Sequence, residues 1–243
     1  MPTKKANELK ELLKEIIHNI EIDGGSGSIV NFPEYEIHPR DFLMYAEDET
    51  ENLKSKKSII NCISNLKRAI DCQIDIFLYS LNLQKCFKNK RLGMDRKLGF
   101  IEKAGLFSKR SLARINTIRN KLEHDYQLPD IDDIHIYFEL VNAFITVLEG
   151  ASSIPGDNSE IYFKLIEWQN DDEAKTIGSF SSKYIFEKPE IQICYTNNDL
   201  KKEFYSGIED LEELAFFVKV HSLLINVSRT YHGQYASSQI KKL

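Results

Sequence analysis

Four residues in one short stretch carry side chains that can act on a phosphate ester: Arg119, Asn120, His124 and Tyr126. An arginine presents a planar fork of N–H groups that fits two phosphate oxygens at once, which a lysine does not. A histidine gains or loses a proton near neutral pH, so it can serve as a general acid or base. The stretch therefore combines the means to bind a phosphate with the means to move a proton beside it.

The spacing of Arg119 and His124 limits how the two side chains can meet. On an α-helix, residues five positions apart point about 140° away from each other. Asn120 and His124, four apart, share one ridge, and Arg119 and Tyr126, seven apart, share another face. The arginine and the histidine therefore reach one phosphate only if the helix bends near its C-terminal end or if a second copy of the chain supplies half of the site.

The order of these residues resembles the motif of the HEPN superfamily of small helical bundles, in which an Arg, a polar residue that is commonly Asn, three variable residues and a His follow each other. Arg119, Asn120 and His124 stand at those positions. Tyr126, two residues after the His, resembles HEPN toxins that are paired with nucleotidyltransferase antitoxins. Residues 65–71 and 106–108 also look like what precedes the motif in this superfamily. The resemblance covers about residues 40–150.

The resemblance implies a metal-independent endoribonuclease, acting as a toxin or antiviral effector, whose cleft lies between two protomers. Such cleavage needs a base for the 2′-OH proton and an acid for the leaving 5′-oxygen, and two copies supply two motif histidines. Arg119 would stabilise charge on the phosphate, and Asn120 would orient His124 or the phosphate. The products would carry 2′,3′-cyclic phosphate and 5′-hydroxyl ends. Arg68 and Asp71, on a neighbouring helix, either tune this site or form an ordinary surface ion pair.

Positive charge is concentrated in the same part of the chain. The whole sequence has a net charge of -5, yet residues 85–121 contain twelve Lys and Arg against only Asp95 and Glu102. A basic segment in an otherwise acidic protein suits contact with a polyanion. Residues 85–103 are equally well explained as a solvated connection between helices. We expect RNA to contact four basic residues on the motif helix: Lys109, Arg110, Arg114 and Lys121.

Simpler roles exist for the motif residues. His124 also fits a polar residue between helices, and Arg119 can pair with Glu123 four residues further on. Tyr126 fits a packing residue beside an apolar stripe as well as a target for modification. Two other functions therefore stay open: a non-catalytic HEPN-like module that binds a partner, or the toxin half of a pair that is neutralised by nucleotidylation at Tyr126.

The elements that must position these residues are mostly helical. Apolar residues at helical spacing predict helices over residues 4–22, 39–83 (a pair or one bent helix), 108–127, 129–150 and 209–229. The clearest apolar stripe, within 59–81, indicates a central buried helix. Ser108 can cap the motif helix and Pro129 stops it. The acidic start of the next helix, at 130–133, complements the helix dipole.

Two segments depart from this helical pattern. Residues 23–28, which read DGGSGS, predict a flexible break. Alternating apolar residues between 161 and 195 predict two or three strands around a polar turn at 170–173. We therefore expect a mainly α fold, an HEPN-like antiparallel helical bundle with a small β-hairpin or meander inserted before the last helix. One domain would span 1–243, with an N-terminal helix and loop (1–38), a helical core (39–152), a β-rich insertion (157–197) and a closing helix (208–230).

The composition of the chain excludes several classes of protein. With 42% apolar and 28% charged residues the chain can bury a core and is not disordered. We find no membrane helix, because the longest apolar run, 214–227, is broken by Lys219 and His221. The N-terminus has no signal-peptide core, and the four cysteines form no CxxC pair. We expect a cytoplasmic protein without disulfides, metal or cofactor. Its expected partners are RNA and a second copy, with an antitoxin or regulatory protein as a further candidate.

Overall fold

The computed structural model describes residues 3–51, 55–108, 110–111, 113–114, 117, 120–121, 125–128, 130–170, 173–198, 200–229 and 233–243. Contacts among residues divide the chain into two compact units, where the sequence suggested one domain. The sheet unit contains Met1–Val30, Leu81–Cys86 and Ser153–Leu243. The helical unit contains Asn31–Ser80 and Phe87–Ser152. Each unit is described by itself.

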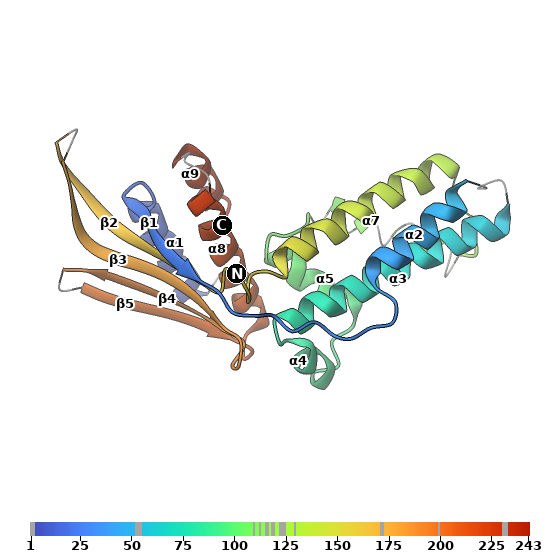
Figure 1. Ribbon diagram of the computed structural model, residues 1–243, viewed down its shortest axis with the longest axis horizontal. Coiled ribbons are helices and arrows are strands. Elements are labelled where there is room, and N and C mark those ends of the chain that lie inside the picture. The colour runs from blue at the N-terminus through green and yellow to red at the C-terminus, as the bar shows by residue number, and fades with distance from the viewer. Residues whose placement is uncertain are drawn as a thin grey trace. The chain divides into compact units, whose positions relative to one another are not determined.

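The sheet unit is built on five antiparallel strands that follow each other across the sheet in the order β1-β2-β3-β4-β5. The strands are β1 (Ile20–Ser26), β2 (Glu160–Asn170), β3 (Glu173–Ile185), β4 (Glu190–Asn197) and β5 (Leu200–Gly207). The unit also contains α1 (Lys4–Ile16), α8 (Leu211–Arg229) and α9 (Gly233–Lys241), which lie on one face of the sheet (Figure 1).

Alternation of side chains along the strands produces the core of this unit. In β4, Ile191, Ile193 and Tyr195 are buried, and the residues between them are only partly covered. Because successive side chains of a strand point to opposite faces, the three buried residues share the face that α8 covers. The α8 side chains that fill the same core recur at helical spacing and include Leu214, Val218 and Leu224.

The expectation of a mainly α fold with a small hairpin was wrong, because the sheet has five strands and draws one of them from near the N-terminus. Helix α1 ends at Ile16, and residues that we expected to form the end of that helix and a flexible break form β1. β1 pairs with β2 in antiparallel register from Ile20 opposite Leu165 to Ser26 opposite Glu160. The protein is therefore a mixed α and β structure.

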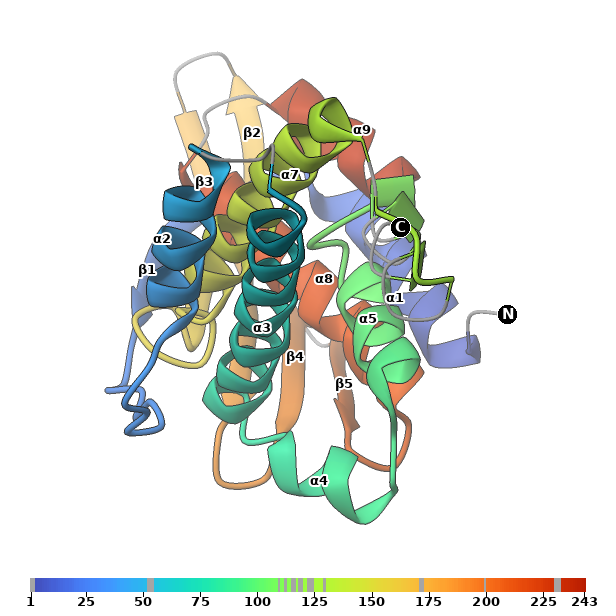
Figure 2. The ribbon, with the colours of Figure 1, turned by 90° about the vertical axis from the view of Figure 1, so that its right-hand side faces the viewer.

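The helical unit contains α2 (Pro39–Thr50), α3 (Lys56–Ser80), α5 (Met94–Lys103) and α7 (Ile131–Ala151), and the short helix α4 (Gln84–Asn89) leads into it. Helices α2 and α7 both pack against α3, and the three run side by side (Figure 2). The stripe predicted for the central helix is confirmed, since Ile63, Leu66 and Ile70 are each at most 5% exposed. The predicted pair of helices over 39–83 is confirmed as α2 and α3.

Polar and aromatic contacts attach α5 to this bundle. The Nζ atom of Lys97 lies 2.6 Å from Oδ1 of Asp75 on α3. The rings of Phe87 and Phe100 meet edge to face with centroids 5.8 Å apart. Asp75 on α3 therefore contributes to holding α5 against the bundle.

Helix α7 is the most apolar helix that the structure describes. Residues Asp132–Ala151 have a mean hydropathy of 1.3 and are long and apolar enough to cross a membrane by length and composition alone. From the sequence, a helix was predicted over 129–150, but the longest apolar run was placed later, at 214–227. Ile134, Val141, Ile145 and Leu148 of α7 are fully buried at helical spacing, as the core helix of a bundle requires.

Candidate functional site

The motif helix begins at the residue that the sequence predicted. The hydroxyl oxygen of Ser108 accepts a hydrogen bond from the backbone N–H of Ser111 at 3.2 Å, which is the geometry of an N-cap. The described residues between Arg110 and Lys121 are helical. Arg119, His124 and Lys109 lie outside the described residues, so their predicted roles stay predictions.

The end of this helix is closed by a backbone turn at Tyr126. The N–H of Asp125 donates to the carbonyl of Asn120 at 3.4 Å, and the N–H of Gln127 donates to the carbonyl of Lys121 at 3.0 Å. Tyr126 has a φ of 53°, the left-handed conformation that commonly ends helices. Its side chain is 87% exposed, so it does not pack against the apolar stripe. Asn120 is exposed as well.

The basic residues that the structure describes near the motif are mostly open to solvent. Arg110 and Arg114 are exposed, and Lys121 is half-buried. Arg114 also contacts α7, because its Nη2 atom lies 3.2 Å from Oδ1 of Asp133. This ion pair connects the motif helix to the first turn of α7. Five further basic residues of the helical unit are exposed upstream: Lys88, Lys90, Arg91, Arg96 and Lys103.

The two candidate tuning residues lie on α3. Arg68 is exposed, and its Nη1 atom donates to Oδ1 of Asn65 at 3.2 Å. Asp71 is half-buried. Part of the Arg68 guanidinium is therefore hydrogen-bonded to Asn65, which lies one helical turn away.

A buried serine and histidine in the sheet unit resemble part of a catalytic set but have a structural role. The Nδ1 atom of His221 lies 2.7 Å from Oγ of Ser182, and its Nε2 atom lies 2.8 Å from the carbonyl oxygen of Asn158. Because a carbonyl only accepts, Nε2 carries the proton and Nδ1 accepts from the serine hydroxyl. Burial lowers the pKa of His221 to about 4. Both side chains are 0% exposed, so no substrate reaches them.

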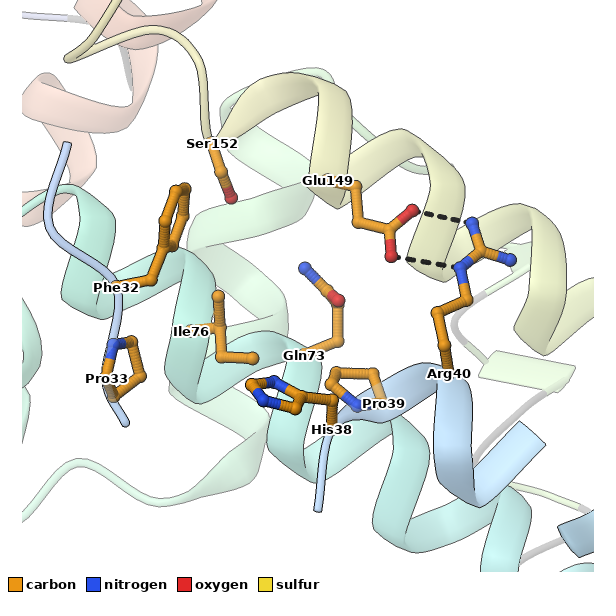
Figure 3. Close-up of a pocket in the computed structure, with 9 residues that line it drawn as sticks. All are labelled: Phe32, Pro33, His38, Pro39, Arg40, Gln73, Ile76, Glu149 and Ser152. Carbon is orange, nitrogen blue, oxygen red and sulfur yellow. Dashed lines mark hydrogen bonds and ion pairs between the residues drawn. The ribbon is translucent and has the colours of Figure 1, made fainter. Parts of the chain in front are cut away.

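A cavity of about 360 Å³ lies in the helical unit, where the segment 32–40 meets α3 and the C-terminal part of α7 (Figure 3). Arg40 and Glu149 line it and form a two-pronged ion pair, with Nε to Oε1 at 3.0 Å and Nη2 to Oε2 at 2.6 Å. The same guanidinium donates to Asn142 and Thr146. Arg40 therefore ties the start of α2 to α7.

This cavity is separate from the motif helix along α7. Arg114 of the motif helix contacts Asp133 at one end of α7, and Glu149 lies at the other end. Sixteen residues of α-helix span about 24 Å, so these two places are far apart. Sequence reasoning did not find the cavity, because its lining residues come from three separate parts of the chain.

Among the described residues, no group of three or more His, Cys, Asp and Glu side chains is arranged to hold a metal ion. The four cysteines are free thiols in this structure. Comparison with protein-family models, with curated proteins and with solved structures gives no match for this chain.

Proposed function

We propose that this protein is an endoribonuclease that cleaves RNA without a metal, through Arg119, Asn120 and His124. The observation that carries the proposal is the motif itself, Arg119-Asn120 followed by His124, in the stretch that follows the helix start capped by Ser108. Two features support it: Asn120 and Tyr126 are exposed on that end, and Arg110 adds positive charge on the same helix. A toxin or antiviral effector is the biological setting that suits such an activity.

The proposed reaction is attack of a ribose 2′-OH on the adjacent phosphorus. One His124 imidazole takes the 2′-OH proton as the oxygen–phosphorus bond forms, and a protonated His124 of a second copy gives a proton to the 5′-oxygen as its bond breaks. Arg119 neutralises the charge that builds on the non-bridging oxygens. Proton and charge balance without any added reactant, and the products are a 2′,3′-cyclic phosphate and a 5′-hydroxyl.

The sequence predicts His124 in the last turns of its helix, and that position would suit this work. The last turn of a helix carries partial negative charge, which stabilises a protonated imidazole. The histidine would thus keep an appreciable protonated fraction near neutral pH, as a general acid needs. A homodimer is part of the proposal, because one chain contains only one motif histidine.

Substitution of the motif residues tests this proposal. Arg119→Ala and His124→Ala should each slow RNA cleavage by about 100-fold or more, as loss of an oxyanion partner or of a general acid or base does. Lys175→Ala is the matched control, because it removes an exposed positive charge from β3 in the sheet unit. It should leave the rate within about twofold. Circular dichroism and sedimentation should show that all three variants stay folded and dimeric.

Two results would count against the enzyme. If folded Arg119→Ala and His124→Ala proteins cut RNA at the wild-type rate, the motif is not the site of cleavage. If the wild-type protein retards RNA in a gel but leaves it intact, the chain is a binding module instead.

One observation favours a second candidate function, the toxin half of a nucleotidylated pair. Tyr126 is 87% exposed in a turn, so its hydroxyl is accessible to a modifying enzyme. Intact-mass and peptide spectrometry of the protein from its native cells should then find one added nucleoside monophosphate on Tyr126. A Tyr126→Phe protein should lack this addition, and a wild-type protein without it would remove this candidate.

A further inference from the structure

The cavity between the segment 32–40, α3 and α7 has the makeup of a small-molecule site. Its volume of about 360 Å³ falls within the roughly 300–1,000 Å³ of pockets that hold small ligands. Apolar rings and side chains make up much of its wall: Phe32, Pro33, Pro39 and Ile76. Such sites are mostly apolar and contain a few polar groups that fix the orientation of the ligand.

Gln73 supplies such a polar group. Its side chain projects from α3 into the cavity, with the amide between Ile76 and Glu149 (Figure 3). The residue is 1% exposed, and its Nε2 atom has no hydrogen-bond partner among the described residues. Buried polar atoms of native proteins almost always have a partner, so an unpaired amide that faces a cavity points to an acceptor that binds there.

The charged residues around the cavity are already paired with each other. Arg40 gives hydrogen bonds to Glu149, Asn142 and Thr146, and this contact with Glu149 raises the pKa of Arg40. A guanidinium that is engaged in this way offers little to a ligand phosphate, and the Glu149 carboxylate beside it repels anions. The group that enters the cavity should therefore carry no net charge.

The chemistry of the side-chain amide narrows the ligand further. A glutamine amide has a donor and an acceptor next to each other, which matches the polar edge of a nucleobase, as in amide pairing with adenine. Phe32 offers an aromatic face, on which heteroaromatic rings stack. A flat ring with one polar edge would satisfy both residues at once.

We propose that this cavity binds one uncharged nucleobase ring, with the polar edge of the ring on the Gln73 amide and its face on Phe32. The proposal does not depend on ribonuclease activity, because the cavity and the motif helix contact opposite ends of α7. The ring could belong to a free nucleoside or to an unpaired base of an RNA strand, and the chemistry of recognition is the same.

The full-length protein can be titrated with adenosine, uridine, AMP and a short oligoadenylate, with binding followed by calorimetry. Adenosine should bind and AMP should bind more weakly, because of the nearby carboxylate. If the free nucleoside is the natural source, adenosine should bind at least as tightly as the oligonucleotide. If an RNA base is the source, the oligonucleotide should bind more tightly and compete with adenosine.

Gln73→Leu tests the role of the amide. It should weaken binding of the preferred probe by tenfold or more, and Gln192→Leu, the same change on β4 of the sheet unit, should not weaken it. Without ligand, Gln73→Leu should melt at the same or a higher temperature, because it replaces an unpaired amide by an apolar group of similar size.

Three outcomes would overturn the proposal. Failure of every probe to bind the wild-type protein at millimolar concentration would show that the cavity does not take nucleobases. Equal binding by Gln73→Leu and wild type would show that the amide does not contact the ligand. A large loss of stability in Gln73→Leu would show that the amide has a structural role. None of these outcomes bears on the Arg119 and His124 variants, so this test and that of the ribonuclease fail independently.

Discussion

His221 gives the clearest pH effect at the level of single residues. Burial lowers the pKa of His221 to about 4, whereas an unfolded histidine titrates near 6.5. Between these values the unfolded chain binds a proton that the folded chain does not, so stability falls as the pH drops from about 6.5 to 4. Above 6.5 the residue contributes no pH dependence. The total loss is about 3 kcal/mol for this difference in pKa.

Urea unfolding at pH 7.5, 5.5 and 4.5 measures this effect. The wild-type free energy of unfolding should decline across the series more steeply than that of His221→Gln, whose amide can still bond to Ser182 or Asn158 without taking up a proton. If the two proteins show the same pH dependence, His221 is not the group that titrates.

Sequence reasoning identified residues whose partners are close in the chain. The cap at Ser108 was correct because its bond to Ser111 spans three residues. The acidic start predicted for the next helix is confirmed as well, since Asp132 and Asp133 lie in the first turn of α7. Gln73 and the partners of His221 were not found from the sequence, because their surroundings form only in the folded chain. The carbonyl that His221 bonds, for example, lies 63 residues away.

At the level of elements, β1 shows why the fold class was predicted wrongly. Gly24 and Gly25 indicated a loop, yet they lie in a strand at the sheet edge. A Cβ atom on Gly25 would lie 2.8 Å from the carbonyl oxygen of Glu160 on β2. Glycine within a strand marks this kind of close backbone approach, which cannot be distinguished from a flexible linker by composition.

Gly25→Ala should therefore destabilise the protein by about 1–3 kcal/mol through the clash with β2. Gly99→Ala is the matched control, since Gly99 lies inside α5 and a Cβ there has open space around it. That change should stabilise the protein by up to about 1 kcal/mol, because alanine favours helix. Denaturant midpoints measure both. A harmless Gly25→Ala would show that β1 does not approach β2 closely.

β5 was missed for a different reason. Only Phe204 and Ser206 of its central residues are buried, and Lys201, Glu203 and Tyr205 alternate with them on the exposed side. An edge strand with so few apolar residues lacks the alternating apolar pattern by which strands are predicted from sequence. The helices α2, α3, α7 and α8 were found because a longer apolar stripe repeats along each of them.

At the scale of the whole molecule, each compact unit is assembled from separate stretches of the chain. Leu81–Cys86 belongs to the sheet unit, although it follows α3 directly. There the hydroxyl of Tyr184 donates to the carbonyl of Leu81 at 2.6 Å, and Nδ2 of Asn82 donates to the carbonyl of Phe186 at 3.0 Å. If residues that are close in sequence are assumed to be close in space, the chain therefore looks like one domain with an insertion.

The proposed site takes a histidine from each of two copies of the chain, so the whole protein should be a homodimer. Sedimentation equilibrium should give twice the chain mass of 28.2 kDa. Binding of RNA should also weaken as salt rises, because basic residues on the motif helix release counterions from phosphates. A monomer at every concentration tested would contradict the two-histidine mechanism.

Analysis of RNA ends after incubation with the pure protein in EDTA tests the central claim most directly. We predict that cleavage continues in the chelator, that the fragments carry 2′,3′-cyclic phosphate and 5′-hydroxyl ends, and that His124→Ala produces none of them. RNA that stays intact, or fragments with 3′-hydroxyl and 5′-phosphate ends, would contradict the account.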